Sequence, residues 1–127
     1  KGYFPKKFLT GEEQAKAMAS AKIVISRAGA NTLAEIAYFG KPAILIPIPW
    51  ASAAEQEKNA RVLADLKMAE IIDQKDLSGK TLLAAIDKIS GNYGQYLENA
   101  KKGRTIVDPD AAKKIVVEIN VILERVK

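Results

Sequence analysis

The segment from Ser26 to Thr32 carries the residues best suited to hold an anion. It follows a short β-branched run and leads directly into a predicted helix. Glycine and alanine within the segment let a ligand approach the backbone closely, while free amides and the dipole of a helix N-terminus attract negative charge. The pattern is typical of a phosphate-binding loop, although Gly29 can also serve only the turn.

Glu35 lies three residues into the predicted helix, on the turn that faces this loop. A carboxylate in that position can accept both hydroxyls of a ribose. A purely structural interpretation competes with this one, because Thr32 and Glu35 also have the spacing of a capping box.

A second polar group follows the next apolar run of the sequence. Gln56 and Asn59 are three residues apart and therefore share one face near the start of a helix. Two amide side chains can read sugar hydroxyls, since each donates and accepts in fixed directions. The alternative is a solvated helix face. Trp50, in the preceding loop, either covers a sugar or base ring or packs on its own domain.

Composition excludes several kinds of chemistry. The chain has no cysteine and no histidine, which excludes Ser-His-Asp and Cys-His catalysis by its own side chains, and we expect no metal and no cofactor. Ser78–Thr81 reads Ser-Gly-Lys-Thr and imitates the end of a P-loop. Gln74 stands where that motif requires its first glycine, so ATP hydrolysis is not expected.

The net charge of +5 suits an anionic partner such as a nucleotide, a nucleic acid or an anionic membrane. Basic pairs are scattered without aromatic residues between them, and aromatic residues make up 6%, so we expect no nucleic-acid partner. No apolar run reaches the roughly 18 residues that cross a bilayer. The start, Lys1–Pro5, lacks the apolar core of a signal peptide, and we expect a cytoplasmic protein.

These candidate residues depend on alternating strands and helices to bring them together. The pattern predicts an α/β fold, a Rossmann-like parallel sheet with flanking helices, in one domain over residues 1–127. Predicted strands span 22–26, 42–47 and 68–73. Predicted helices span 10–20, 32–39, 52–66 with Ser52 as cap, one from Ser78, 96–102 after a turn at 92–94, and one from Asp108.

Three segments together resemble the MurG family, the UDP-N-acetylglucosamine–N-acetylmuramyl-(pentapeptide) pyrophosphoryl-undecaprenol N-acetylglucosamine transferases. They are Ala21–Glu35, Gly40–Pro47 and Glu55–Ala60. That family has a two-domain GT-B fold whose C-terminal domain holds the donor. The resemblance implies that this chain is a partial C-terminal donor-binding domain, without the N-terminal acceptor domain and without the first Gly-rich loop.

The resemblance also implies roles for individual residues. The amides of Ala30–Thr32 would meet the donor diphosphate, Glu35 the ribose, and Gln56 and Asn59 the GlcNAc hydroxyls. Arg27 would orient the loop or face the phosphates. Trp50 and Ala53 depart from the family, which commonly has a histidine and an acidic residue in that loop. The full set expected to bind the donor, with Phe8 and Leu9 at the uracil, is Phe8, Leu9, Arg27, Gly29, Ala30, Asn31, Thr32, Leu33, Ala34, Glu35, Gln56 and Asn59.

The family's reaction is an inverting transfer of GlcNAc from UDP-GlcNAc to the C4 hydroxyl of lipid I, which gives lipid II for peptidoglycan. The resemblance places the catalytic groups in the other domain, so this chain alone is expected to be inactive. It also implies the lipid I acceptor and a peripheral location on the inner face of the plasma membrane, with consequences for cell shape and division. Two alternatives stay open: a non-catalytic module that binds a nucleotide sugar or a partner, and a related glycosyltransferase with another sugar or acceptor.

Overall fold

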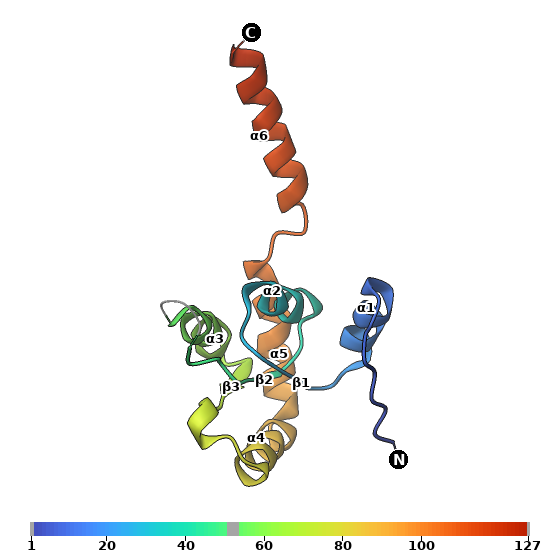
Figure 1. Ribbon diagram of the computed structural model, residues 1–127, viewed down its shortest axis with the longest axis vertical. Helices are drawn as coiled ribbons and strands as arrows, with labels where there is room; N and C mark the ends of the chain where they lie inside the picture. Colours follow the sequence, from blue (N-terminus) through green and yellow to red (C-terminus); the bar gives the residue numbers. More distant parts are fainter. Residues whose placement is uncertain (1, 51–53, 127) are drawn as a thin grey trace.

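A three-stranded parallel sheet forms the centre of the molecule (Figure 1). The computed structural model describes residues 2–50 and 54–126. Strands β1 (Val24–Ser26), β2 (Ala43–Leu45) and β3 (Ala69–Ile71) lie in the order β1-β2-β3. The predicted α/β fold with a parallel sheet is confirmed. Each strand is shorter than predicted, and for β2 the flanking Pro42 and Pro47 explain this, because proline has no amide to donate to a ladder.

The part of the chain that the structure describes contains six helices. Their bounds are α1 Gly11–Ser20, α2 Ala30–Phe39, α3 Glu55–Asp65, α4 Gly79–Gly91, α5 Tyr93–Gly103 and α6 Ala111–Val126, with short 3-10 turns η2 Gln74–Asp76 and η3 Arg104–Ile106. The predicted capping box at Thr10 and Glu13 is present. Ser78 and Thr81 form a second capping box that begins α4, which explains the Ser-Gly-Lys-Thr sequence without a phosphate.

Three predicted helix starts differ from the structure. Helix α2 begins at Ala30 with Gly29 as its N-cap, so a capping box between Thr32 and Glu35 is wrong. The predicted turn at 92–94 is present but confined to Asn92. Helix α5 begins at Tyr93, which packs on the core, and the amides of residues 95 and 96 both bond to the carbonyl of Asn92. The predicted cap Ser52 lies outside the described residues; α3 has Ala54 as its N-cap, at φ 56°.

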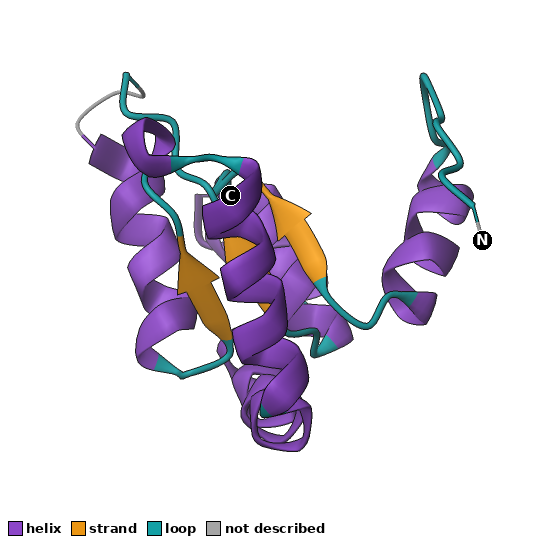
Figure 2. Cartoon of the chain, turned by 90° about the horizontal axis from the view of Figure 1, so that it is seen from below, coloured by secondary structure: helices purple, strands orange, loops and turns teal. Residues whose placement is uncertain are grey.

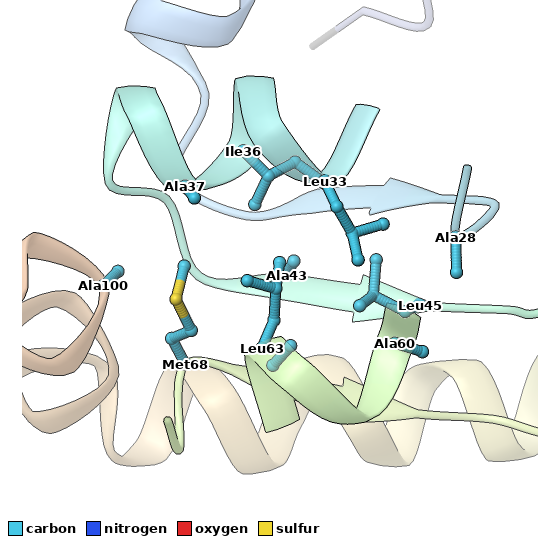
Figure 3. Close-up of a cluster of buried hydrophobic side chains, with 11 residues drawn as sticks. Ala28, Leu33, Ile36, Ala37, Ala43, Leu45, Ala60, Leu63, Met68 and Ala100 are labelled. Carbon is cyan, nitrogen blue, oxygen red and sulfur yellow. The ribbon is translucent and has the colours of Figure 1, made fainter. Parts of the chain in front are cut away.

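Strand β2 is buried on both of its faces. Ala43 and Leu45 face a cluster formed with α2, α3 and α5, which includes Ile36 and Leu63 (Figure 3). The next residue, Ile44, faces the opposite side, where it packs with Ile72, which directly follows β3, and with Ile89 of α4. Helices therefore cover both faces of the sheet (Figure 2), and alternate residues of one strand join two separate cores.

Helix α5 contributes to both cores. Ala100 belongs to the cluster under α2 and α3, whereas Tyr96 packs in the cluster under α4. Tyr96 donates a hydrogen bond to Glu70 of β3, and burial together with this carboxylate raises the pKa of Tyr96 to about 12. At the other end of α5, a Cβ on Gly103 would lie 2.5 Å from the sulfur of Met68, so only glycine fits there without movement.

Helix α6 extends away from the sheet (Figure 1) and buries none of its residues. Its apolar side chains, including Ile115, Ile119 and Ile122, follow the three-four spacing of a single helix face, and all three are about half exposed or more. At its start Lys114 bonds to Asp108 and thereby lowers the pKa of that carboxyl. None of the helices that the structure describes has the length and hydropathy to cross a membrane.

The first core gives a direct test of this arrangement. Leu63 of α3 is fully buried against the sheet. We expect Leu63→Ala to lower the free energy of unfolding by about 2–5 kcal/mol, because the truncation leaves a cavity. Urea denaturation measures this. Leu83→Ala serves as the control, since that side chain on α4 is 58% exposed and its loss should cost under about 0.5 kcal/mol. Equal costs for the two variants would contradict the packing described here.

Candidate functional site

The N-terminus of α2 presents three amides at the carboxyl end of β1. The first hydrogen bond inside the helix runs from the amide of Leu33 to the carbonyl of Gly29 at 3.0 Å. The amides of Ala30, Asn31 and Thr32 precede it and have no carbonyl partner within the helix. The predicted free amides of Ala30, Asn31 and Thr32 are therefore present. They are free because α2 begins two residues earlier in the sequence than the predicted start at Thr32.

Gly29 leaves this N-terminus bare. Its φ of −68° is one that any residue adopts, so the turn itself does not require glycine. A Cβ built at Gly29 would meet no atom within 4 Å. The position is open, and the absence of a side chain gives a ligand access to the backbone. The interpretation of Gly29 as a residue that only serves the turn is therefore not supported.

Gln56 and Asn59 hold this loop in place. The Oε1 atom of Gln56 accepts hydrogen bonds from the amides of Ala28 (3.3 Å) and Ile48 (3.1 Å). The Nδ2 atom of Asn59 donates to the carbonyl of Ala28 at 3.3 Å. Both side chains are half-buried, so the predicted alternative of a solvated helix face is wrong. They join the loops that follow β1 and β2 to the first turns of α3.

Arg27 connects the ends of all three strands. Its Nη1 atom donates to the carbonyl of Ile46, after β2, at 3.2 Å and to Oε1 of Gln74, after β3. These contacts fit the predicted role of Arg27 in orienting the loops, and its role at the phosphates stays a prediction. Sequence reasoning missed Gln74 as a partner; its place directly after the third predicted strand was the only signal.

Glu35 lies on the side of α2 that faces α1. It is half-buried, and its Oε2 atom accepts a hydrogen bond from Nε2 of Gln14 at 2.7 Å. Because α2 begins at Ala30, Glu35 is the sixth helical residue and lies in the second turn. The predicted position three residues into the helix is therefore wrong. Gln14 is a further residue of the site that the sequence pattern did not indicate.

Three hollows lie around these residues, and the predicted site is divided between them. Glu35 and Gln14 line one of about 130 Å³ between α1 and α2. A second, of about 200 Å³ between α2, α3 and η3, is lined by Ala30, Leu33, Ala34, Asn59, Val62, Leu63, Ile106 and Val107. A third, of about 240 Å³, lies between the loops after β2 and β3 and includes Ile48 and Gln74. Glu35 and Asn59 do not line a common hollow.

The aromatic residues of the predicted site are exposed. Phe8 is 89% and Trp50 75% exposed, so the interpretation that Trp50 packs on its own domain is wrong. Phe8 and Leu9 precede the N-cap of α1, and their role at a uracil stays a prediction. Ala53 lies outside the described residues. Among residues 2–50 and 54–126, no group of three or more carboxylate side chains is placed to hold a metal ion.

Because the Oε1 atom of Gln56 accepts two hydrogen bonds, its loss should lower the stability of the domain even without a ligand. Gln56→Leu removes the acceptor and leaves the amides of Ala28 and Ile48 unpaired, which should lower the free energy of unfolding by about 1–3 kcal/mol. Gln56→Glu keeps an oxygen in place and should retain most of the stability. Thermal unfolding of both variants checks this, and equal stability of Gln56→Leu and the wild type would contradict it.

Comparisons with known proteins agree with the resemblance seen in the sequence. Residues 10–115 match the glycosyltransferase family 28 C-terminal domain. The UDP-N-acetylglucosamine–N-acetylmuramyl-(pentapeptide) pyrophosphoryl-undecaprenol N-acetylglucosamine transferase of Bacillus cytotoxicus is 47% identical over 94 residues, 73% of this chain and 26% of that protein. The protein of the same name from Desulforamulus reducens is 40% identical over 110 residues, 87% of this chain and 30% of its own length.

A solved structure agrees as well. MurG of Acinetobacter baumannii matches with a TM-score of 0.78 and 33% sequence identity, over 89% of this chain and 32% of that chain. This chain thus spans less than a third of the length of each of these relatives. The sequence match covers all three strands and helices α1 to α5, so the sheet and the loops at its carboxyl end are the matched parts. The chain belongs to the glycosyltransferase family 28 C-terminal domain family.

Proposed function

We propose that this chain binds UDP-GlcNAc as the donor-binding part of an inverting glycosyltransferase that forms lipid II from lipid I. The observation that carries the proposal is the open N-terminus of α2, with the amides of Ala30, Asn31 and Thr32 beside the bare backbone of Gly29. Family membership and the names of the relatives support the choice of ligand.

The diphosphate is the part of the donor that this N-terminus suits. Three amides donate in one direction, and the helix dipole adds about half a positive charge there. As the bond from GlcNAc to the diphosphate breaks, negative charge grows on the leaving UDP. Amides that are already in position stabilise this additional charge as it develops in the transition state, and they need no metal to do so. The chain thereby contributes to the transfer without supplying a proton acceptor.

The amide atoms of Gln56 and Asn59 that do not hold the loops are available to bind the sugar. Gln56 uses Oε1 and Asn59 uses Nδ2 to hold Ala28 and Ile48. Within the described ranges, Nε2 of Gln56 and Oδ1 of Asn59 have no hydrogen-bond partner, so one donor group and one acceptor stay available for GlcNAc hydroxyls. Their directions are set because the other half of each amide is already bonded.

The acceptor and the cellular location belong to the same proposal. Lipid I would be bound mainly outside this chain, in the longer protein that the relatives represent. The positive net charge of +5 is suited to the anionic inner face of the plasma membrane, where a lipid-linked acceptor is found. We place the enzyme there, on the cytoplasmic side, in peptidoglycan synthesis.

A different donor sugar is the second candidate, and one observation favours it. Trp50 follows β2 in the sequence and is largely exposed, and an exposed aromatic face can stack on a sugar ring. The family's nucleotide chemistry would be unchanged, and only the sugar read by this loop would differ. Titration with UDP-glucose beside UDP-GlcNAc separates the two candidates.

Calorimetric titration of this chain with UDP-GlcNAc tests the proposal, with ADP-glucose as the control ligand. We expect selective binding of UDP-GlcNAc. Glu35→Gln should weaken it roughly 10–100-fold, because hydrogen bonds to a charged group contribute about 1.5–3 kcal/mol. Glu12→Gln is the matched control, since Glu12 is exposed on α1 and pairs with Lys16.

Two results would contradict the proposal. Equal affinity for ADP-glucose and UDP-GlcNAc would remove the uridine-specific site. Absence of binding by a sample with a cooperative thermal transition would remove the donor-binding role of this chain. Transferase activity is not expected from the chain alone, so a product assay is not a substitute for the titration.

A further inference from the structure

Gln14 of α1 touches the one carboxylate that the proposed site assigns to the ribose. Its Nε2 atom donates to Oε2 of Glu35 at 2.7 Å, across 21 residues of sequence. This contact joins α1 to α2. We propose that Gln14 is a positioning residue, which fixes the Glu35 carboxylate so that it discriminates nucleotides by their ribose hydroxyls. The inference rests on the proposed function and adds a residue to it.

The hydrogen bond from Gln14 occupies only one of the acceptor sites of the Glu35 carboxylate. An ionised carboxylate has two oxygens and about four acceptor sites, and Gln14 occupies one of them. Within the described residues, Oε1 of Glu35 accepts no hydrogen bond. One oxygen is thus held while the other remains able to accept from adjacent hydroxyls. A carboxylate without this partner would have to lose its rotational freedom on binding the ligand.

Two contacts join the second half of α1 to the rest of the domain. Its start is set by the reciprocal hydrogen bonds of Thr10 and Glu13. Its end is tied by Lys41, whose Nζ donates to the carbonyl of Ala19 at 2.7 Å. Between them, Met18 packs against the first core. Gln14 lies one turn before Met18 and Ala19, so these contacts and its own hydrogen bond set the direction from which its amide approaches Glu35.

The hollow between α1 and α2 beside Gln14 and Glu35 has a lining that suits a ribose. Its volume is about 130 Å³, and Glu35 is the one charged residue among the described residues that line it. Gly11 and Ala15 of α1 and Phe39 of α2 provide small or apolar walls. One carboxylate and one amide among such walls suit an uncharged part of a ligand that carries hydroxyls. A ribose fits that description, whereas a phosphate would be repelled by Glu35.

The experiment measures the ratio of the affinities for UDP and 2′-deoxy-UDP by calorimetry. Wild type should prefer UDP at least tenfold. Gln14→Met, which keeps the length of the side chain and removes its donor, should reduce that preference about fivefold. Gln14→Glu should reduce it further, because it brings a second negative charge to Glu35. Lys16→Met is the matched control on the opposite side of α1, where the side chain is 74% exposed, and should leave the ratio unchanged.

A double-mutant cycle separates this inference from the proposed function. In the Glu35→Gln background, Gln14→Met should have no further effect on the ratio, since the two residues act as one unit. If Glu35→Gln retains the wild-type preference, the ribose role of Glu35 fails and the proposal about Gln14 fails with it. If Glu35→Gln loses the preference but Gln14→Met retains it, or weakens both ligands equally, only the positioning role is overturned.

Discussion

Burial of β2 on both faces is the constraint on which the rest of the structure depends. Ile44 and Leu45 are fully buried on opposite sides of this strand, and each contributes about 1.5–3 kcal/mol by leaving water. The strand lies between β1 and β3, so its position fixes theirs. It also fixes the atoms just beyond its end, the carbonyl of Ile46 and the amide of Ile48, to which Arg27 and Gln56 bond. The geometry of the loops follows from the packing of the strand.

The candidate site is built from side chains that bond to backbone atoms of neighbouring loops. Arg27, Gln56 and Asn59 each contact a backbone atom that follows a strand, so the loops are held by polar contacts that the cores do not provide. Such a site is organised before any ligand arrives, and little ordering remains to be done on binding. In the proposed site, Gln56 and Asn59 both hold the loops and bind the ligand. Only variants that keep the amide atom bonded to the loop and change the other one can separate these two roles.

Local signals in the sequence predicted much of the fold. The β-branched run before Ser26 and the apolar segment between Pro42 and Pro47 identified the first two strands, and the alternation of strands with helices identified the parallel sheet. Thr10 with Glu13 marked a helix start, because the two residues satisfy each other's amides within one turn. The start of α2 could not be predicted from such a signal, because its N-cap Gly29 has no side chain to form a capping bond. Thr32 and Glu35 have the spacing of a capping box and pointed to a later start.

Contacts between distant residues explain the rest of the difference. Gln14 meets Glu35, and Gln56 meets Ala28, across 21 and 28 positions. No periodicity encodes such a pair; it exists only once the helices have packed. The family resemblance proposed the residues of the site, and the parallel sheet explains why Arg27, Gln56 and Asn59 meet the loops that follow its strands. Neither indicated that Gln56 would hold two backbone amides at once.

The double membership of α5 has a consequence for how the chain is made. Ala100 closes one core and Tyr96 the other, yet both are synthesised after every strand. Both apolar faces of the sheet therefore stay incomplete until α5 has left the ribosome. We expect the domain to gain much of its stability late in synthesis, and the incomplete faces to favour association with other chains before then.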